Sequence, residues 1–296
     1  MNGLDEKPVI FEFRGETLVG VLHPATNAAA RLGVLVVVGG PQYRVGSHRQ
    51  FVLMARDLAR AGFPVLRFDY RGMGDSDGES TNFEAVGDDI RAATDRFLEA
   101  QPALDAVVLW GLCDAASAAL MEGHRDRRVV GLILANPWVR TEAGKARAYL
   151  DHYYRRRLLQ RSFWAKALSG KFSPARAARE WWGTWRRASK GGSADAATGH
   201  FLDRMLYGLR AFRGPMLLLI SENDLTAQEF VAYRAASRDW QQLAGRRDVR
   251  TVNLPGADHT FSSRTALDAA TRSCVEWLAT LSESHVLRAP GEASAK

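Results

Sequence analysis

A continuous apolar run over residues 32–38, rich in β-branched side chains, constrains the fold of this chain more than any other feature. A strand that is apolar at every position buries both of its faces, which is typical of the centre of a parallel sheet. Parallel strands need long crossover connections, which helices usually supply. Strand-like and helix-like segments do alternate along the chain, so we predict a mostly parallel, doubly wound α/β sheet.

The alternation of periodicities indicates where the individual elements lie. Strands are expected over residues 9–13, 17–22, 32–38, 64–70, 105–110, 129–135, 216–220 and 249–254, the first two as an antiparallel pair. Helices are expected over residues 50–61, 83–100, 115–123, 229–243 and 264–281. The pattern predicts a core formed by residues 1–137 and 214–281, an inserted helical lid over 138–213 and a flexible tail over 282–296.

Composition excludes several classes of protein. The chain is 46% hydrophobic and 25% charged, which is ordinary for a globular protein and argues against disorder. Its longest apolar runs fall far short of the roughly 20 residues that span a bilayer, and the first residues lack a signal-peptide pattern. We therefore expect a cytoplasmic location. Two cysteines, Cys113 and Cys274, are too few for a disulfide scaffold.

Basic charge is concentrated in the predicted lid. Residues 140–190 hold 14 Lys and Arg against 3 acidic residues, and 138–185 hold five of the eight tryptophans. Three interpretations stay open: a solvated arginine face, a surface that contacts an anionic membrane or polysaccharide, and an anion site for substrate. Nucleic acid is not expected as a partner, because no recognised reader motif accompanies the charge.

The junction between residues 105–110 and 115–123 carries the strongest chemical signal. It reads Gly111-Leu112-Cys113-Asp114-Ala115, with small residues on both sides of a central nucleophile. This pattern is typical of a strained turn between a strand and a helix, which projects the nucleophile at the carboxyl edge of a sheet. At a helix N-terminus the positive end of the dipole favours the thiolate form of Cys113.

A nucleophile of this kind needs a base and a group that orients the base. Asp224 follows the strand predicted over 216–220, and His259 follows the strand predicted over 249–254. The sequence therefore predicts a triad in the chain order Cys113, Asp224, His259. His259 would take the thiol proton or hold it as an ion pair, and Asp224 would fix the tautomer of His259.

Catalysis also needs N–H donors for a developing oxyanion. We expect one from the backbone of Asp114, the residue after the nucleophile. The second should come from the loop after residue 38, where Pro41 has no N–H, so Gln42 or Gly40 is the candidate. Cys274 has no partner motif and is expected in the core. No metal-ligand cluster or phosphate-binding loop occurs, so no metal or cofactor is expected.

These features resemble the α/β-hydrolase superfamily over nearly the whole chain apart from the lid and tail. Residues 68–76, which contain Asp69, Arg71, Gly72, Gly74 and Ser76, are similar to the superfamily's D-x-R-G-x-G-x-S loop. Cys113 stands where most members have Ser, and Ala115 where most have Gly, as in dienelactone-hydrolase-like relatives that use a thiol. Gly39-Gly40 replaces the usual His-Gly before the oxyanion loop.

More narrowly, the strings over residues 38–50 and 110–117 resemble the type 1 exosortase A system-associated hydrolases. That resemblance implies a bacterial cytoplasmic protein encoded with exopolysaccharide and PEP-CTERM protein-sorting genes, and it names no substrate.

The predicted activity is hydrolysis of an ester or thioester of a small acyl substrate through a Cys113 acyl-thioester, because thiols suit activated esters and thioesters better than peptide bonds. An acyltransferase would use the same triad. A non-catalytic binding protein with the same fold is the alternative from another class.

Overall fold

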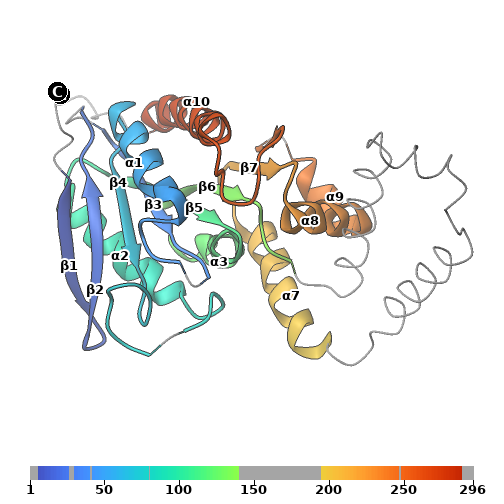
Figure 1. The fold of residues 1–296 in the computed structure, drawn as a ribbon, viewed down its shortest axis with the longest axis horizontal. Coiled ribbons are helices and arrows are strands. Elements are labelled where there is room, and N and C mark those ends of the chain that lie inside the picture. The colour runs from blue at the N-terminus through green and yellow to red at the C-terminus, as the bar shows by residue number, and fades with distance from the viewer. Residues whose placement is uncertain are drawn as a thin grey trace, which may run out of the picture.

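The computed structural model describes residues 6–26, 30–40, 42–79, 81–139, 195–246 and 248–288, without the side chains of 195–200, 243–244 and 284–288. Within these ranges the centre of the molecule is an eight-stranded sheet with helices on both faces (Figure 1). Its strand order is β1-β2-β4-β3-β5-β6-β7-β8. The predicted doubly wound, mostly parallel sheet is therefore confirmed.

The elements follow the predicted alternation closely. The strands are β1 (Lys7–Phe13), β2 (Glu16–His23), β3 (Leu32–Val37), β4 (Val65–Asp69), β5 (Ala106–Leu112), β6 (Val129–Ala135), β7 (Met216–Ser221) and β8 (Val249–Leu254). The α-helices are α1 (Gln50–Arg60), α2 (Gly87–Ala100), α3 (Asp114–Glu122), α7 (Asp195–Ala211), α8 (Leu225–Ala236), α9 (Arg238–Ala244) and α10 (Arg264–Arg288). Two short 3-10 helices cover Ser47–Arg49 and Gly123–Arg125.

The direction of the strands decides where a site can form. Strand β2 is antiparallel to β1 and to β4, whereas β4, β3, β5, β6, β7 and β8 run parallel to one another. Every residue of β3, β4, β5 and β7 is buried, as expected for strands covered on both faces. Six parallel strands therefore end at one edge of the sheet, and the loops that follow them meet there.

Alternate residues of the central strand feed two separate hydrophobic cores. On β5, Val107 and Leu109 enter one core, whereas Val108 and Trp110 enter the other. The first core lies under α2, α3, α7 and α8, and the second lies under α1 and α10. Both faces of the central strands are thus buried, which leaves the edge formed by the strand ends as the place where a site can form.

The C-terminal part of the predicted lid is a helix packed on the body of the protein. Helix α7 lies against α3 (Figure 1), and Leu202, Met205 and Leu209 are buried in the first core. Gly208 allows the approach, because a Cβ there would lie 2.0 Å from the backbone oxygen of Leu120. Residues 140–194, which hold the basic Trp-rich part of the predicted lid, lie outside the described residues.

Four helix boundaries differ from the prediction. The helix expected to begin at residue 229 begins at Leu225, because the Asp224 side chain caps it there. Helix α2 begins at Gly87 because Asn82 forms a turn in which its side chain accepts a hydrogen bond from the Glu84 N–H. The helix expected over 229–243 is two helices, because Ser237 has an extended backbone between α8 and α9. Helix α10 runs to Arg288, so the helix does not end at residue 281 as predicted, since no Gly or Pro interrupts the chain there.

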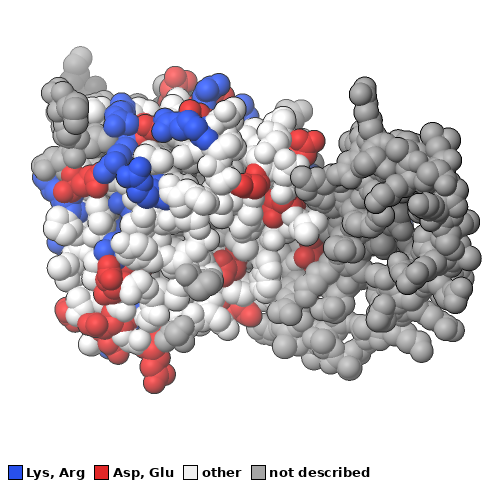
Figure 2. Space-filling view, viewed as in Figure 1, with Lys and Arg blue, Asp and Glu red and all other residues white. Residues whose placement is uncertain are grey.

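The charged groups are unevenly spread over the face shown in Figure 2. Lys and Arg gather at the upper left, over the part of the molecule where Figure 1 places α1, while the centre is mainly uncharged. Among the residues that the structure describes, no helix is both long and apolar enough to cross a membrane.

The close contact of α7 with α3 can be tested by Gly208→Ala. Alanine favours a helix by about 1 kcal/mol over glycine in isolation, but here the added methyl meets backbone and forces the helices apart. We expect a net loss of about 2 kcal/mol in the free energy of unfolding, measured by urea denaturation. Gly245→Ala is the matched control, because a Cβ at Gly245 meets nothing closer than 3.5 Å. Equal effects of the two substitutions would contradict the packing of α7 on α3.

Candidate active site

The turn between β5 and α3 holds Cys113 in a strained conformation. Its φ of 62° and ψ of −124° lie outside the regions that L residues favour. The turn is sharp enough that a Cβ on Gly111 would lie 2.5 Å from the backbone of Ala115. A side chain at position 111 would therefore clash with the first turn of α3, and the predicted elbow is present with Cys113 at its apex.

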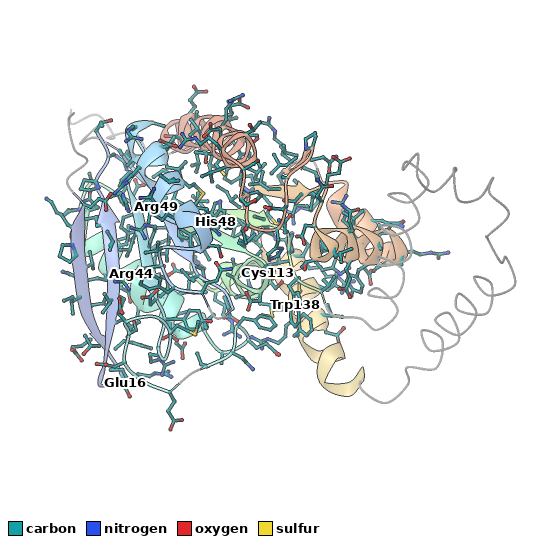
Figure 3. The ribbon with its side chains drawn as sticks, in the orientation of Figure 1. Glu16, Arg44, His48, Arg49, Cys113 and Trp138 are labelled. Atoms are coloured by element: carbon teal, nitrogen blue, oxygen red, sulfur yellow. The ribbon has the colours of Figure 1, made fainter. Side chains whose placement is uncertain are left out.

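The elbow is fastened to the end of β6. The Cys113 N–H donates to the Ala135 carbonyl at 3.0 Å, and the Cys113 carbonyl accepts from the Trp138 N–H at 3.2 Å. The Ser117 hydroxyl donates to the Trp138 carbonyl at 2.7 Å, which closes the connection from α3. Figure 3 shows Cys113 near the centre of the molecule with Trp138 beside it. These contacts use the backbone groups of Cys113, and its half-buried side chain packs against the edge of the second core.

Asp224 is held rigidly at the start of α8. Its carboxylate caps the helix by accepting hydrogen bonds from Thr226 N–H at 3.0 Å and Ala227 N–H at 3.2 Å. The side chain is buried, and its Oδ2 lies 2.7 Å from Nδ1 of His259. A carboxylate fixed in this way sets the orientation of the imidazole and stabilises its charged form.

His259 lies between Asp224 and Cys113. Burial acts to lower the pKa of His259, but hydrogen bonds and charge interactions with Asp224 and Cys113 outweigh it and raise the pKa to about 10. The imidazole is therefore protonated at neutral pH and faces the sulfur with a positive charge. The structure thus brings together Cys113, Asp224 and His259, the three residues that the sequence suggested, from loops after β5, β7 and β8.

Asn136 is a residue of the site that sequence reasoning missed. It directly follows β6, is fully buried and has a left-handed φ of 45°. Its Nδ2 donates to Ser221 Oγ at 2.9 Å and to the His259 carbonyl at 3.3 Å, while its Oδ1 accepts from Ser221 N–H at 2.8 Å. One amide therefore ties the end of β6 to the end of β7 and to the loop that carries His259. An Asn directly after a buried strand was the one available signal.

Of the three predicted oxyanion donors, Gly40 has a hydrogen-bond partner within the protein. The Gly40 N–H donates to Oδ2 of Asp114 at 2.8 Å, so it is not free to meet an oxyanion in this conformation. The backbone N–H of Asp114 remains the predicted donor next to the nucleophile. Gln42 keeps its place as the candidate for the second donor, with its Oε1 buried and unpartnered. Pro41 lies outside the described residues.

The loop over residues 69–76 supports the loop after β3. Asp69, fully buried, accepts hydrogen bonds from Arg44 N–H at 2.6 Å and Asp75 N–H at 3.1 Å, and it also pairs with the Arg44 guanidinium. A Cβ on Gly74 would lie 2.2 Å from Asp69 Oδ2, which explains the glycine. The Ser76 hydroxyl donates to the Asp69 carbonyl at 2.6 Å. These polar residues act structurally, by clamping the neighbouring loop through Arg44.

The second cysteine has a different environment. Cys274 is fully buried in α10 within the second core, as the sequence suggested. Burial raises the pKa of its thiol to about 12, so Cys274 stays protonated and inert at neutral pH. The contrast with the partly exposed Cys113 leaves a single thiol at the carboxyl edge of the sheet.

Comparison with known proteins agrees with this arrangement. Residues 34–270 match the sequence pattern of the alpha/beta hydrolase family. The chain belongs to the alpha/beta hydrolase family. The predictions of an α/β-hydrolase fold and of a hydrolase are thereby confirmed, while the narrower resemblance to exosortase-associated hydrolases stays a prediction.

Individual relatives are distant. The human protein ABHD12B is 35% identical over 101 residues, which cover 33% of this chain and 27% of ABHD12B, so the match spans about a quarter of that relative. The structure of the Pyrococcus furiosus esterase Pf2001 is 14% identical, with a TM-score of 0.62 over 94% of this chain and 93% of that one. A thermostable carboxyl esterase from Bacillus coagulans gives 16% identity and a TM-score of 0.62 over 94% and 99%. At these identities the two structures share the fold.

Asn136→Ala tests whether the amide holds this hydrolase's site together. The substitution leaves buried polar groups of Ser221 and His259 unpaired, so we expect the free energy of unfolding to fall by about 2 kcal/mol in urea denaturation. Asn136→Asp keeps the acceptor for Ser221 N–H but places a carboxyl oxygen opposite the His259 carbonyl at a fully buried position, so it should destabilise the protein at least as much as Asn136→Ala. Asn253→Ala on exposed β8 surface is the control and should change stability by less than about 0.5 kcal/mol. An equal response at positions 136 and 253 would contradict the role of Asn136.

The raised pKa of His259 predicts how stability depends on pH. The folded state holds the proton with a pKa of about 10, above the ordinary value of 6.5. The stabilisation from charged His259 is therefore full below about pH 6.5 and is lost as the pH rises towards 10. The difference in free energy of unfolding between wild type and His259→Gln should shrink across that range. A difference that does not vary with pH would mean that folding does not raise the pKa of His259.

Proposed function

We propose that this hydrolase cleaves an ester or thioester through an acyl-thioester on Cys113. The observation that carries the proposal is the position of His259, whose Nδ1 lies 2.7 Å from Asp224 and whose pKa is raised by its interactions with Asp224 and Cys113 against the effect of burial. A base oriented by a carboxylate and in contact with a nucleophile on a strained turn is the arrangement that acyl transfer requires. Membership of the alpha/beta hydrolase family supports the same chemistry.

The geometry suggests how the bonds change. The sulfur of Cys113, as the partner of the His259 cation, attacks the substrate carbonyl and forms a carbon–sulfur bond. The carbonyl electron pair moves to oxygen, which backbone N–H groups hold. The tetrahedral intermediate collapses with loss of the alcohol or thiol, which takes its proton from Nε2 of His259. Neutral His259 then removes a proton from water, which attacks the thioester and releases the acid and Cys113.

The surroundings of the site favour a substrate without charge near its carbonyl. The centre of the visible face shows Asp and Glu but no Lys or Arg, which disfavours an anionic group there (Figure 2). Cys113 also contacts aromatic residues through the backbone of Trp138, whose ring stacks on Phe201 at a centroid distance of 5.4 Å and meets Phe83 edge-on at 5.2 Å. The half-buried Trp138 lies beside Cys113 in Figure 3, so it offers apolar surface near the nucleophile. The two structural neighbours named above are esterases, which favours an ester among the candidate substrates.

We also propose a cellular setting from the sequence resemblance. The strings over residues 38–50 and 110–117 resemble the type 1 exosortase A system-associated hydrolases, which implies a role in the cytoplasm beside exopolysaccharide production and PEP-CTERM protein sorting. The basic segment over 140–190, which would contact an anionic membrane or polysaccharide, lies outside the described residues. Its charge alone supports that contact.

Acylation of Cys113 is the decisive test of the proposed activity. Purified protein is mixed with nitrophenyl esters and acyl-CoA thioesters of several chain lengths, and adducts are sought by intact mass. We expect wild type and Cys274→Ala to form an acyl adduct and release free acid, and Cys113→Ala to do neither. His259→Gln should slow acylation by about 100-fold or more. The substitution removes the cation that pairs with the sulfur, and the same side chain also supplies the proton for the leaving group.

Each outcome of that assay has a distinct meaning. An adduct that accumulates in water and disappears on addition of an alcohol acceptor would indicate acyl transfer rather than hydrolysis. Wild-type protein that is folded but neither acylates nor reacts with iodoacetamide at neutral pH would contradict the proposed function and favour a binding protein.

A further inference from the structure

The side chain of Asp114 joins two parts of the site that are far apart in sequence. Its backbone follows the nucleophile, and its carboxylate reaches across to the loop after β3. Oδ2 accepts a hydrogen bond from the Gly40 N–H at 2.8 Å, and Oδ1 accepts one from the Ala115 N–H at 2.9 Å. Both oxygens are thus used, one towards the oxyanion loop and one towards the first turn of α3.

The chain around Asp114 is shaped to accept this carboxylate. A Cβ on Gly39 would lie 2.0 Å from Asp114 Oδ1 and 2.8 Å from the Ala115 nitrogen, so only glycine fits against the elbow. Gly40 has a φ of 58°, a left-handed conformation that glycine adopts without strain. The Gly39-Gly40 pair therefore leaves room for the Asp114 carboxylate and donates a hydrogen bond to it. This pair stands where the superfamily usually has His-Gly.

Several ionisable groups face this carboxylate. Burial raises the pKa of Asp114, while the N–H groups of Gly40 and Ala115 and the charge of His259 act to lower it. Burial, and after it the charge of Asp114, raises the pKa of Tyr70, which follows β4, to about 12. Asp114 is thus surrounded by groups from the loops after β3, β4, β5 and β8, and it does not form part of the Asp224–His259 pair.

We propose that Asp114 is a positioning residue, whose carboxylate fixes the Gly39-Gly40 turn against the nucleophile elbow and so holds the second oxyanion donor in place. Because Gly40 N–H is engaged by the carboxylate, that donor comes from further along the loop, and Gln42 is the first candidate that has an N–H. This inference rests on the proposed function for its catalytic consequence, whereas the contact between Asp114 and Gly40 does not depend on that function.

Two reactions of Cys113 separate positioning of the oxyanion loop from damage to the triad. Acylation by a nitrophenyl ester needs the oxyanion donors, whereas alkylation by iodoacetamide needs only the sulfur and His259. We expect Asp114→Asn, which can still accept one of the two hydrogen bonds, to lower kcat for the ester by about 10-fold, and Asp114→Ala by about 100-fold, with KM little changed. Alkylation should stay within about 3-fold of wild type in both variants. Asp88→Asn is the control, because Asp88 is exposed and pairs with Arg14 at 2.6 Å, away from the site.

The contact itself is measured without any substrate. In protein labelled with 15N-glycine, the Gly40 amide should be protected from hydrogen exchange in wild type and in Asp88→Asn, and should lose at least about 10-fold of that protection in Asp114→Ala. Unchanged exchange at Gly40 would overturn the inference, and so would equal losses of acylation and alkylation. If wild type fails to acylate, the proposed function fails, and exchange at Gly40 still decides whether Asp114 positions the turn.

Discussion

The strained backbone of Cys113 is the constraint on which the rest of the site depends. A left-handed residue between a buried strand and a helix is costly and persists only when its surroundings hold it. Here the absence of a side chain on Gly111 avoids a clash with Ala115. Backbone hydrogen bonds also tie the turn to the last residue of β6 and to the first turn of α3. The same conformation leaves the Cys113 side chain partly buried at the carboxyl edge of the sheet, where it packs against the second core. The surrounding structure holds this strained backbone in place, because every residue of β5 is packed inside the protein.

Hydrogen bonds between loops that are distant in sequence hold the other residues of the site next to the elbow. Asn136 joins the ends of β6 and β7 to the loop of His259, and Asp114 joins the elbow to the loop after β3. Asp69 and Arg44 clamp that same loop to the end of β4. Each contact links residues that only a parallel sheet could bring together, so the fold and the site are specified by the same hydrogen bonds.

Sequence alone predicted those parts that depend on local patterns. Strands buried on both faces show as continuous apolar runs, and the triad residues follow strands whose ends share one edge, so their placement was predictable. Asn136 and the side chain of Asp114 were not, because their partners are 85 and 74 residues away and no local motif marks them. The packing of α7 was hidden by the basic composition of the segment before it, although Leu202, Met205 and Leu209 lie at helical spacing.

The charges around the nucleophile bear on the kind of substrate that the site can process. His259 carries one positive charge, and it faces Asp224, Cys113 and Asp114. Two carboxylates, those of Asp114 and Asp224, lie near this one imidazole, and N–H groups at Gly40, Ala115, Thr226 and Ala227 donate hydrogen bonds to them. An anionic group next to the reacting carbonyl would add charge of the same sign in a partly buried region, which is unfavourable. The arrangement of charges therefore favours an uncharged acyl group, in keeping with the aromatic rings of Trp138, Phe201 and Phe83 near the elbow.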